Sequence, residues 1–234
     1  MKFLLVCLMF FSAAANAEQL VVKMKSTSTM YLMQNNKHLH KNIYMIDGDL
    51  AKLQADPNVE YAEPNVKFHI MGFPVMRRLG ADTDANKAWG VDKIQASKMW
   101  DQGFKGDGIR IAVIDTGVDG SHPELAGKVE AGFNAIDGTD NSMDDNSHGT
   151  HVSGTIAGNT VGVAPNVTIV PVKFIDADGS GTLANAVKAI SWAMAAHVQI
   201  MSNSWGGGSD SKAMREIIKE ATDAGIYFVV AAGN

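Results

Sequence analysis

The chain has 234 residues, of which 46% are hydrophobic and 19% are charged, with 23 glycines and a net charge of -5 at pH 7. This balance is typical of a folded globular protein and excludes a disordered or low-complexity chain. The length is sufficient for one sizeable core and a small additional unit. Because the chain is mildly acidic and has no basic patch interleaved with aromatic residues, nucleic acid is not an expected partner.

Residues 1–17 have the features of a secretory signal peptide. Lys2 precedes an apolar run over residues 3–11, and Ala15 and Ala17 form a small-residue cleavage site. The alternative, a membrane anchor, is disfavoured because the apolar run is too short to cross a bilayer. We therefore predict a secreted protein, extracellular or periplasmic, with no membrane attachment once the signal is removed. The single cysteine, Cys7, lies in this segment, so the mature chain is expected to have no thiol for disulfides or catalysis.

Residues 18–70 are predicted to form a small α+β unit. Its pattern indicates strands at residues 20–25, 42–46 and 59–63 and a short helix at residues 49–54. The unit is marginal in size for independent stability, which suits a segment that folds against a partner surface. Residues 71–88 have no periodicity and are predicted to be a linker that contains or adjoins a processing site. Arg77-Arg78 is a candidate for that site, although a basic pair in an exposed linker is more often incidental.

From residue 89 onward, short apolar runs alternate with helical segments. The runs at residues 109–114, 168–172, 198–202 and 226–231 are typical of buried parallel strands. Helices are predicted at residues 148–158, 183–196 and 211–224, with Ser147 as the N-cap of the first and Gly225 after the end of the last. The pattern predicts an α/β fold with a doubly wound, mainly parallel sheet and flanking helices. In such folds the functional site lies at the carboxyl ends of the strands.

Three polar residues with complementary chemistry are predicted to meet at that edge. Asp115 follows the first of these strands, and a buried carboxylate needs a cationic or hydrogen-bonding partner. His148, which opens a helix, suits this role, because a carboxylate fixes the imidazole tautomer and leaves the other nitrogen as a general base. Asn234 follows the last strand and presents an amide that can stabilise an oxyanion. We predict that Asp115, His148 and Asn234 are catalytic residues.

Five motifs, taken in order, resemble those of the subtilisin-like serine proteases, the subtilases. They surround Asp115 (Val-Ile-Asp-Thr-Gly-Val-Asp) and His148 (His-Gly-Thr-His-Val-Ser-Gly-Thr) and continue at residues 178–181, 204–207 and 231–234. The resemblance implies a secreted serine endopeptidase, with the N-terminal part of the catalytic domain at residues 89–234 and an inhibitory propeptide at residues 18–70. It also implies that two backbone segments clamp an extended peptide substrate, namely Gly179, Ser180, Gly181, Ser204, Trp205 and Gly206.

The nucleophile of that family lies in a Gly-Thr-Ser motif, which does not occur in this sequence. We therefore expect a protease precursor whose serine lies beyond Asn234, and a fragment that is inactive alone. The alternative is an inactive truncated homologue that binds peptides or acts as a decoy. Expected partners are polypeptide substrates and the chain's own propeptide, which would act as an intramolecular inhibitor of a monomeric protein.

No cofactor is expected from the sequence. Calcium-binding subtilisins have a long loop where this chain has only a short connection between Thr155 and Gly162. Glu124 alone is a poor calcium site, because calcium requires six or more oxygen ligands. The acidic side chains before His148 could bind an ion, but a solvated loop is the favoured interpretation. Trp205 is bulkier than the aliphatic residue often found at its position in the family, and either narrows a substrate pocket or packs in the core.

Two other enzyme classes share single motifs with the chain. Asp115-Thr116-Gly117 also occurs in aspartic proteases, but those enzymes need a second carboxylate and an all-β setting, and Val118 follows here. His148 and His151 could bind zinc, but a third ligand and a His-Glu-x-x-His arrangement are missing.

Overall fold

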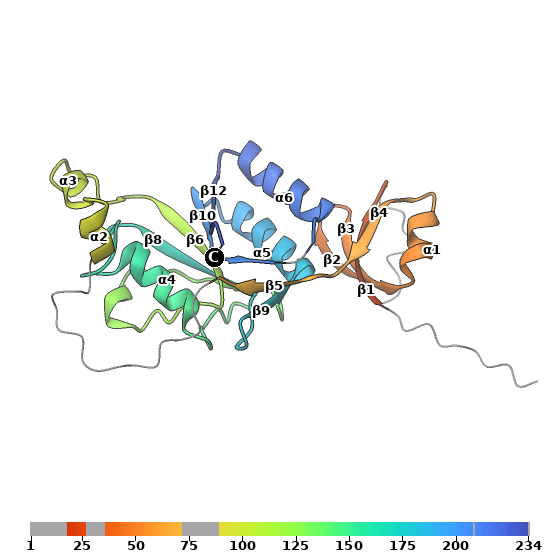
Figure 1. The fold of residues 1–234 in the computed structure, drawn as a ribbon, viewed down its shortest axis with the longest axis horizontal. Helices are drawn as coiled ribbons and strands as arrows, with labels where there is room; N and C mark the ends of the chain where they lie inside the picture. The colour runs from red at the N-terminus through yellow and green to blue at the C-terminus, as the bar shows by residue number, and fades with distance from the viewer. Residues whose placement is uncertain (1–17, 27–35, 72–88, 208, 234) are drawn as a thin grey trace, which may run out of the picture.

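The structure is a computed structural model that describes residues 18–26, 36–71, 89–207 and 209–233. These residues form three sheets, with strand orders β2-β3-β1-β4, β12-β10-β6-β8-β7 and β11-β5-β9 (Figure 1). The predicted signal peptide, nearly all of the predicted linker and Asn234 lie outside the described residues. Within the described ranges, no helix is long and apolar enough to cross a membrane.

The first sheet and one short helix make up an N-terminal unit, shown in red to orange in Figure 1. Leu20 and Val22 on β1 face a small core that includes Leu53 of the helix, whereas Val21 between them belongs to the main core of the protein. This alternation places the helix on one face of the sheet and the rest of the chain on the other. The elements are β1 (Glu18–Met24), β2 (Lys37–His40), β3 (Ile43–Gly48), α1 (Leu50–Ala55) and β4 (Val59–Pro64).

The second sheet is parallel throughout and lies between two layers of helices. Ile111 and Val113 of β6 (Arg110–Asp115) pack in a core cluster with α4 (His148–Ala157). Ala112 and Ile114 pack in the cluster that contains α5 (Leu183–Ala195) and α6 (Lys212–Asp223). Because neighbouring residues of a strand point to opposite faces, helices cover both faces of this sheet. The predicted doubly wound α/β fold is therefore confirmed.

The strands of this sheet are β6 (Arg110–Asp115), β7 (Phe133–Asn134), β8 (Thr168–Lys173), β10 (Ile200–Asn203) and β12 (Tyr227–Val230). The helices of this part of the chain are α2 (Trp89–Lys93), α3 (Ser97–Trp100), the 3-10 turn η3 (Pro123–Leu125), α4 (His148–Ala157), α5 (Leu183–Ala195) and α6 (Lys212–Asp223). The four strands and three longer helices predicted here are all present, with small shifts at their ends. Gly225 has φ +84 and follows α6, as predicted for a residue that ends a helix.

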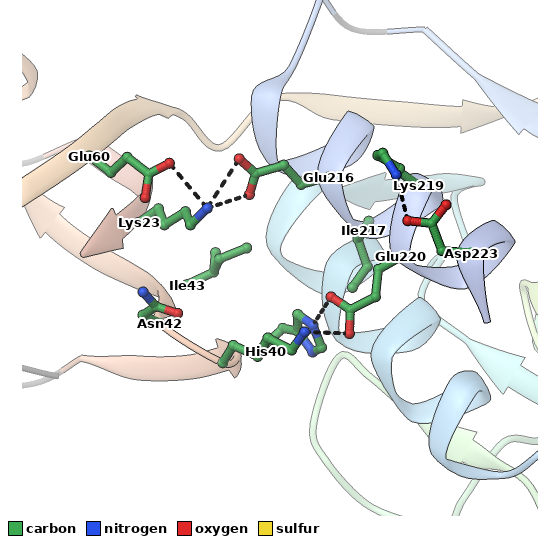
Figure 2. Close-up of a pocket in the computed structure, with 11 residues that line it drawn as sticks. Lys23, His40, Asn42, Ile43, Glu60, Glu216, Ile217, Lys219, Glu220 and Asp223 are labelled. Atoms are coloured by element: carbon green, nitrogen blue, oxygen red, sulfur yellow. Dashed lines mark hydrogen bonds and ion pairs between the residues drawn. The ribbon is translucent and has the colours of Figure 1, made fainter. Parts of the chain in front are cut away.

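The N-terminal unit packs against α5 and α6 with an apolar centre and a polar border. Its contributions to the shared core are Val21, Leu39, Ile43 and Tyr61. Beside this centre lies a hollow of about 610 Å³. On its lining, Figure 2 shows Lys23 between Glu60 and Glu216, and His40 directed at Glu220. Partly exposed ion pairs contribute only about 0–1 kcal/mol each, so apolar burial supplies most of the docking energy.

Polar groups of the N-terminal unit also satisfy the free N–H groups at the starts of both helices. Glu63 accepts hydrogen bonds from Ser211 Oγ (2.7 Å) and from the backbone N–H groups of Lys212 (2.9 Å) and Ala213 (3.0 Å), where α6 begins. Asn65 Oδ1 accepts from the N–H of Ala184 in the first turn of α5, at 2.9 Å. The first turn of a helix has N–H groups without intrahelical partners, so these acceptors dock the unit in one orientation.

The third sheet joins the N-terminal unit to the rest of the protein. Its central strand, β5 (Lys67–Ile70), leaves the N-terminal unit and runs antiparallel between β9 (Ser180–Thr182) and β11 (Trp205–Gly206). Figure 1 shows β5 beside β9. The sequence analysis predicted none of these three strands, nor β2. Each has only two to four residues, which is too short to show a clear period.

Candidate active site

Asp115 is the last residue of β6 and its side chain is fully buried. Its Oδ1 accepts a hydrogen bond from the backbone N–H of Thr116 at 2.7 Å and lies 2.8 Å from Nδ1 of His148. Its Oδ2 is buried and has no hydrogen-bond partner among the described residues. A buried carboxylate is costly unless it is paired, so Asp115 strongly favours a donor at His148 Nδ1.

His148 is the first residue of α4 and reaches from the helix end to the carboxyl end of β6. Its second ring nitrogen, Nε2, lies 3.1 Å from the backbone oxygen of Met71. Both partners of the ring are acceptors, so a ring bonded to both donates from both nitrogens and is protonated. The hydrogen bond to Asp115 raises the pKa of His148; burial opposes this, and the charge of Asp115, the Met71 carbonyl and the charge of Asp144 reinforce it.

The start of α4 differs from the sequence prediction. Ser147 occupies the predicted N-cap position, but it has φ +87 and its side chain makes no capping hydrogen bond. Two side chains of the loop before the helix and one that follows β6 take that role. Acceptors for the N–H groups of the first three helical residues are Asn146 Oδ1, Thr116 Oγ1 and Asp144 Oδ2. The free N–H groups of the first turn are therefore satisfied without the residue that immediately precedes it.

Two segments of backbone hold β5 as an extended strand that ends beside His148. Ile70 donates its N–H to the oxygen of Gly179 at 3.1 Å, and Met71 donates its N–H to the oxygen of Ser204 at 2.8 Å. All six residues predicted to clamp a peptide lie along this strand, either paired with it or bonded to it, namely Gly179, Ser180, Gly181, Ser204, Trp205 and Gly206.

Gly181 has a steric reason to lack a side chain. A Cβ atom at this position would lie 2.7 Å from Cε2 of Phe174 and 2.8 Å from its backbone oxygen. Such contacts are too short for real Cβ atoms, so a larger residue would push β9 away from its neighbours.

Trp205 combines the two roles considered from the sequence. It is 9% exposed, and its Nε1 donates to the oxygen of Ile114 at 2.9 Å. Its ring meets Phe174 at a centroid distance of 4.8 Å and Phe68 of β5 at 5.2 Å, both edge-on. Trp205 therefore belongs to the core and also packs against Phe68, a side chain of the bound strand.

The remaining candidate residues are placed as follows. Asn234 lies outside the described residues, and within the described part of the chain Nε2 of His148 contacts the Met71 oxygen rather than a serine hydroxyl. His151, in the first turn of α4, is exposed. The sequence analysis missed Met71 and Lys173. Lys173 is buried, and its Nζ donates to the oxygens of Thr116 (2.6 Å) and Ile175 (2.9 Å), which ties the ends of β6 and β8 together.

Known proteins resemble this chain in both sequence and fold. Minor extracellular protease Epr of Bacillus subtilis (strain 168) is 35% identical over 210 residues, which cover 86% of this chain and 32% of that protein. Subtilisin DY of Bacillus licheniformis is 40% identical over 151 residues, which cover 62% of this chain and 54% of that protein.

Among solved structures, fervidolysin from Fervidobacterium pennivorans, a keratinolytic enzyme related to subtilisin, matches with a TM-score of 0.75 and 27% identity. The match covers 93% of this chain and 40% of that one. The chain thus spans about a third to a half of the length of these relatives. Residues 106–234 match the peptidase S8 description of the subtilase family. The chain belongs to the subtilase family.

Proposed function

We propose that the protein is the precursor of a secreted serine endopeptidase. In this proposal Asp115 orients His148 and stabilises its protonated form, and His148 is the general base. A serine beyond Asn234 is the nucleophile, and Asn234 donates to the oxyanion. The catalytic assignment rests on family membership and on the 2.8 Å contact between His148 Nδ1 and Asp115 Oδ1.

One observation carries the proposal furthest: a backbone carbonyl, that of Met71, lies 3.1 Å from Nε2 of the proposed base. The peptide that bears it is an extended strand paired on both edges, as a bound substrate would be. We infer that residues 18–70 are an inhibitory propeptide whose C-terminal strand occupies the substrate cleft. Residues 1–17 are the signal peptide, and residues 71–88 are a linker that contains the processing site.

The same geometry selects the bond that the enzyme would cleave in itself. The serine oxygen would attack the carbonyl carbon of Met71 while His148 takes the hydroxyl proton. His148 would then donate this proton to the amine of Gly72 as the Met71–Gly72 bond breaks. Hydrolysis of the acyl-enzyme at Met71 would leave that residue as the new carboxyl end of the propeptide. Processing at this bond is favoured over Arg77-Arg78 because Met71 is the residue held against the base.

The other expectations follow from this function. The substrates are polypeptides, which bind as a strand between β9 and β11, and the mature protein is a monomer in the extracellular space or the periplasm. Relatives with matching sequence are named extracellular proteases. We propose no metal cofactor, since the proposed chemistry needs only the serine, the base and the oxyanion donor.

The test is covalent labelling of the secreted protein by a serine-directed phosphonate, read by intact mass. The account predicts one adduct on the wild type and none on a His148→Ala variant, because the serine is not activated without its base. A matched control, His151→Ala, removes a histidine from the exposed side of the same helix and should label like the wild type. A wild-type protein that takes up no adduct would contradict the proposal and favour an inactive homologue that binds peptides.

A further inference from the structure

Asp144 lies four residues before His148 and its carboxylate accepts hydrogen bonds at both oxygens. Oδ1 accepts from the hydroxyl of Thr116 at 2.8 Å and from the N–H groups of Asn146 and Ser147, each at 3.0 Å. Oδ2 accepts from the N–H of Thr150 at 2.9 Å and from its hydroxyl at 2.5 Å. A half-buried side chain with this many local donors holds the loop before α4 in one conformation.

This carboxylate is charged in the folded protein. Burial alone would raise the pKa of Asp144, but the hydrogen bonds from the Thr150 side chain and from the backbone of Asn146, Thr150 and Ser147 outweigh it and lower the pKa. A negative charge beside the first turn of α4 is also favoured by the helix dipole. Asp144 therefore fixes the end of the helix that carries His148.

Thr116 extends the network to the other partner of the base. Its side chain is fully buried; its hydroxyl donates to Asp144 and accepts from the N–H of Gly149 at 2.9 Å. Its own N–H donates to Oδ1 of Asp115, the same oxygen that contacts His148. Hydrogen bonds thus join the residue after Asp115 to the residue after His148 and to the carboxylate of Asp144.

We propose that Asp144 is a positioning residue that, acting through Thr116 and Thr150, sets the geometry of His148 against Asp115. The inference rests on the proposed function, in which His148 is the base. Transition-state geometry is sensitive to small displacements of a catalytic group, so a loosened helix start lowers the rate without touching the substrate cleft. The six cleft residues named above pair with or bond to β5, whereas the hydrogen bonds of Asp144 to described residues go to Thr116, Asn146, Ser147 and Thr150.

Two carboxylates act on the protonation of His148, and a buried lysine bonds to the same network. Asp115 and Asp144 are the anions that act on the ring, and both favour its protonated form. Lys173 is a buried cation that donates to the Thr116 oxygen and is paired with Asp145 at 2.7 Å. We therefore expect the removal of the Asp144 charge to lower the pKa of His148.

The experiment is kinetic and compares Asp144→Asn with Asp140→Asn in the full-length protein that includes the nucleophile. Asp140 is an exposed acidic residue of the same loop, so its variant removes the same charge. We expect Asp144→Asn to lower kcat about 10- to 100-fold with KM changed less than about threefold. We also expect the acid limb of its kcat–pH profile to move to lower pH. Asp140→Asn should match the wild type in all three.

A second pair of variants keeps the proposal testable if Asp144→Asn does not fold. Thr116→Ser keeps the hydroxyl that links Asp144 to Gly149, whereas Thr116→Val removes it at similar volume. We expect Thr116→Ser to retain most of the kcat and Thr116→Val to lose it. Equal activity in the serine and valine variants would overturn the proposal.

An NMR titration of the His148 ring separates this proposal from the proposed function. It requires no turnover, so it can be made on the intact protein even if no peptide is hydrolysed. A lowered His148 pKa in Asp144→Asn, with no shift in Asp140→Asn, supports the positioning network whether or not the protein hydrolyses peptides. Unchanged titration together with unchanged kcat would overturn the network, whereas a wild type without hydrolysis would overturn only the proposed function.

Discussion

Replacing Glu63 by alanine is expected to weaken the hold of the N-terminal unit on the rest of the protein. The carboxylate of Glu63 accepts three hydrogen bonds at the start of α6, from Ser211 Oγ, Lys212 N and Ala213 N. A hydrogen bond to a charged group contributes about 1.5–3 kcal/mol, and loss of a helix cap costs about 0.5–2 kcal/mol. Lys212 is exposed, so water replaces part of the loss there.

A net loss of about 2–4 kcal/mol is therefore expected, which corresponds to an inhibition constant about 30- to 700-fold weaker. The assay supplies residues 18–71 as a separate polypeptide and measures its inhibition of the processed protease. Glu63→Gln should fall between alanine and the wild type, because it keeps one acceptor oxygen but loses the charge. Asp47→Asn is the matched control, since Asp47 is exposed on β3. An inhibition constant for Glu63→Ala within about threefold of the wild type would refute the reasoning.

Other perturbations probe the base, the bound strand and the loop beside α4. Asp115→Asn removes the largest cause of the raised pKa of His148, so NMR should show the ring of this variant titrating at lower pH. In the wild type, activity should fall as the pH decreases through the raised pKa of His148, because the base must be neutral. Phe68→Ala, at a site 5% exposed, should cost about 3–5 kcal/mol and lower the Tm of the unprocessed protein, and an unchanged Tm would show that β5 is not docked. A chelator should leave the Tm unchanged. The Glu124 carboxylate accepts hydrogen bonds from the N–H (2.7 Å) and the hydroxyl (2.5 Å) of Thr160, and these bonds hold the segment between Thr155 and Gly162 without an ion.

The sequence predicted the elements whose signals are local and repeated. Apolar runs bounded by turns identified the four main strands, and the apolar face of α5, with Leu183, Val187 and Ile190, identified that helix. Placement of Asp115 and His148 at strand and helix ends then followed from topology, because such ends meet at one edge of a doubly wound sheet. The distance between the two side chains required the structure.

The missed features depend on contacts between distant parts of the chain. Strand β5 forms because β9 and β11 accept it, more than a hundred residues away, although its alternation of exposed Lys67 and His69 with buried Phe68 was a weak local signal. The lack of a capping hydrogen bond from the Ser147 side chain has a similar cause. A serine before a helix is normally a good cap, but Asp144 and the distant Thr116 supply the acceptors here, and Ser147 takes a positive φ instead.

The most direct test of the account is the N-terminal sequence and intact mass of the mature secreted protein. The account places the Met71 carbonyl at the base, so it predicts a mature chain that begins at Gly72 and a released fragment that ends at Met71. His148→Ala should be secreted with the N-terminal unit still attached. A wild-type chain that begins after Arg78, or a His148→Ala variant processed normally, would contradict the claim that this site cuts its own N-terminal unit at the strand it holds.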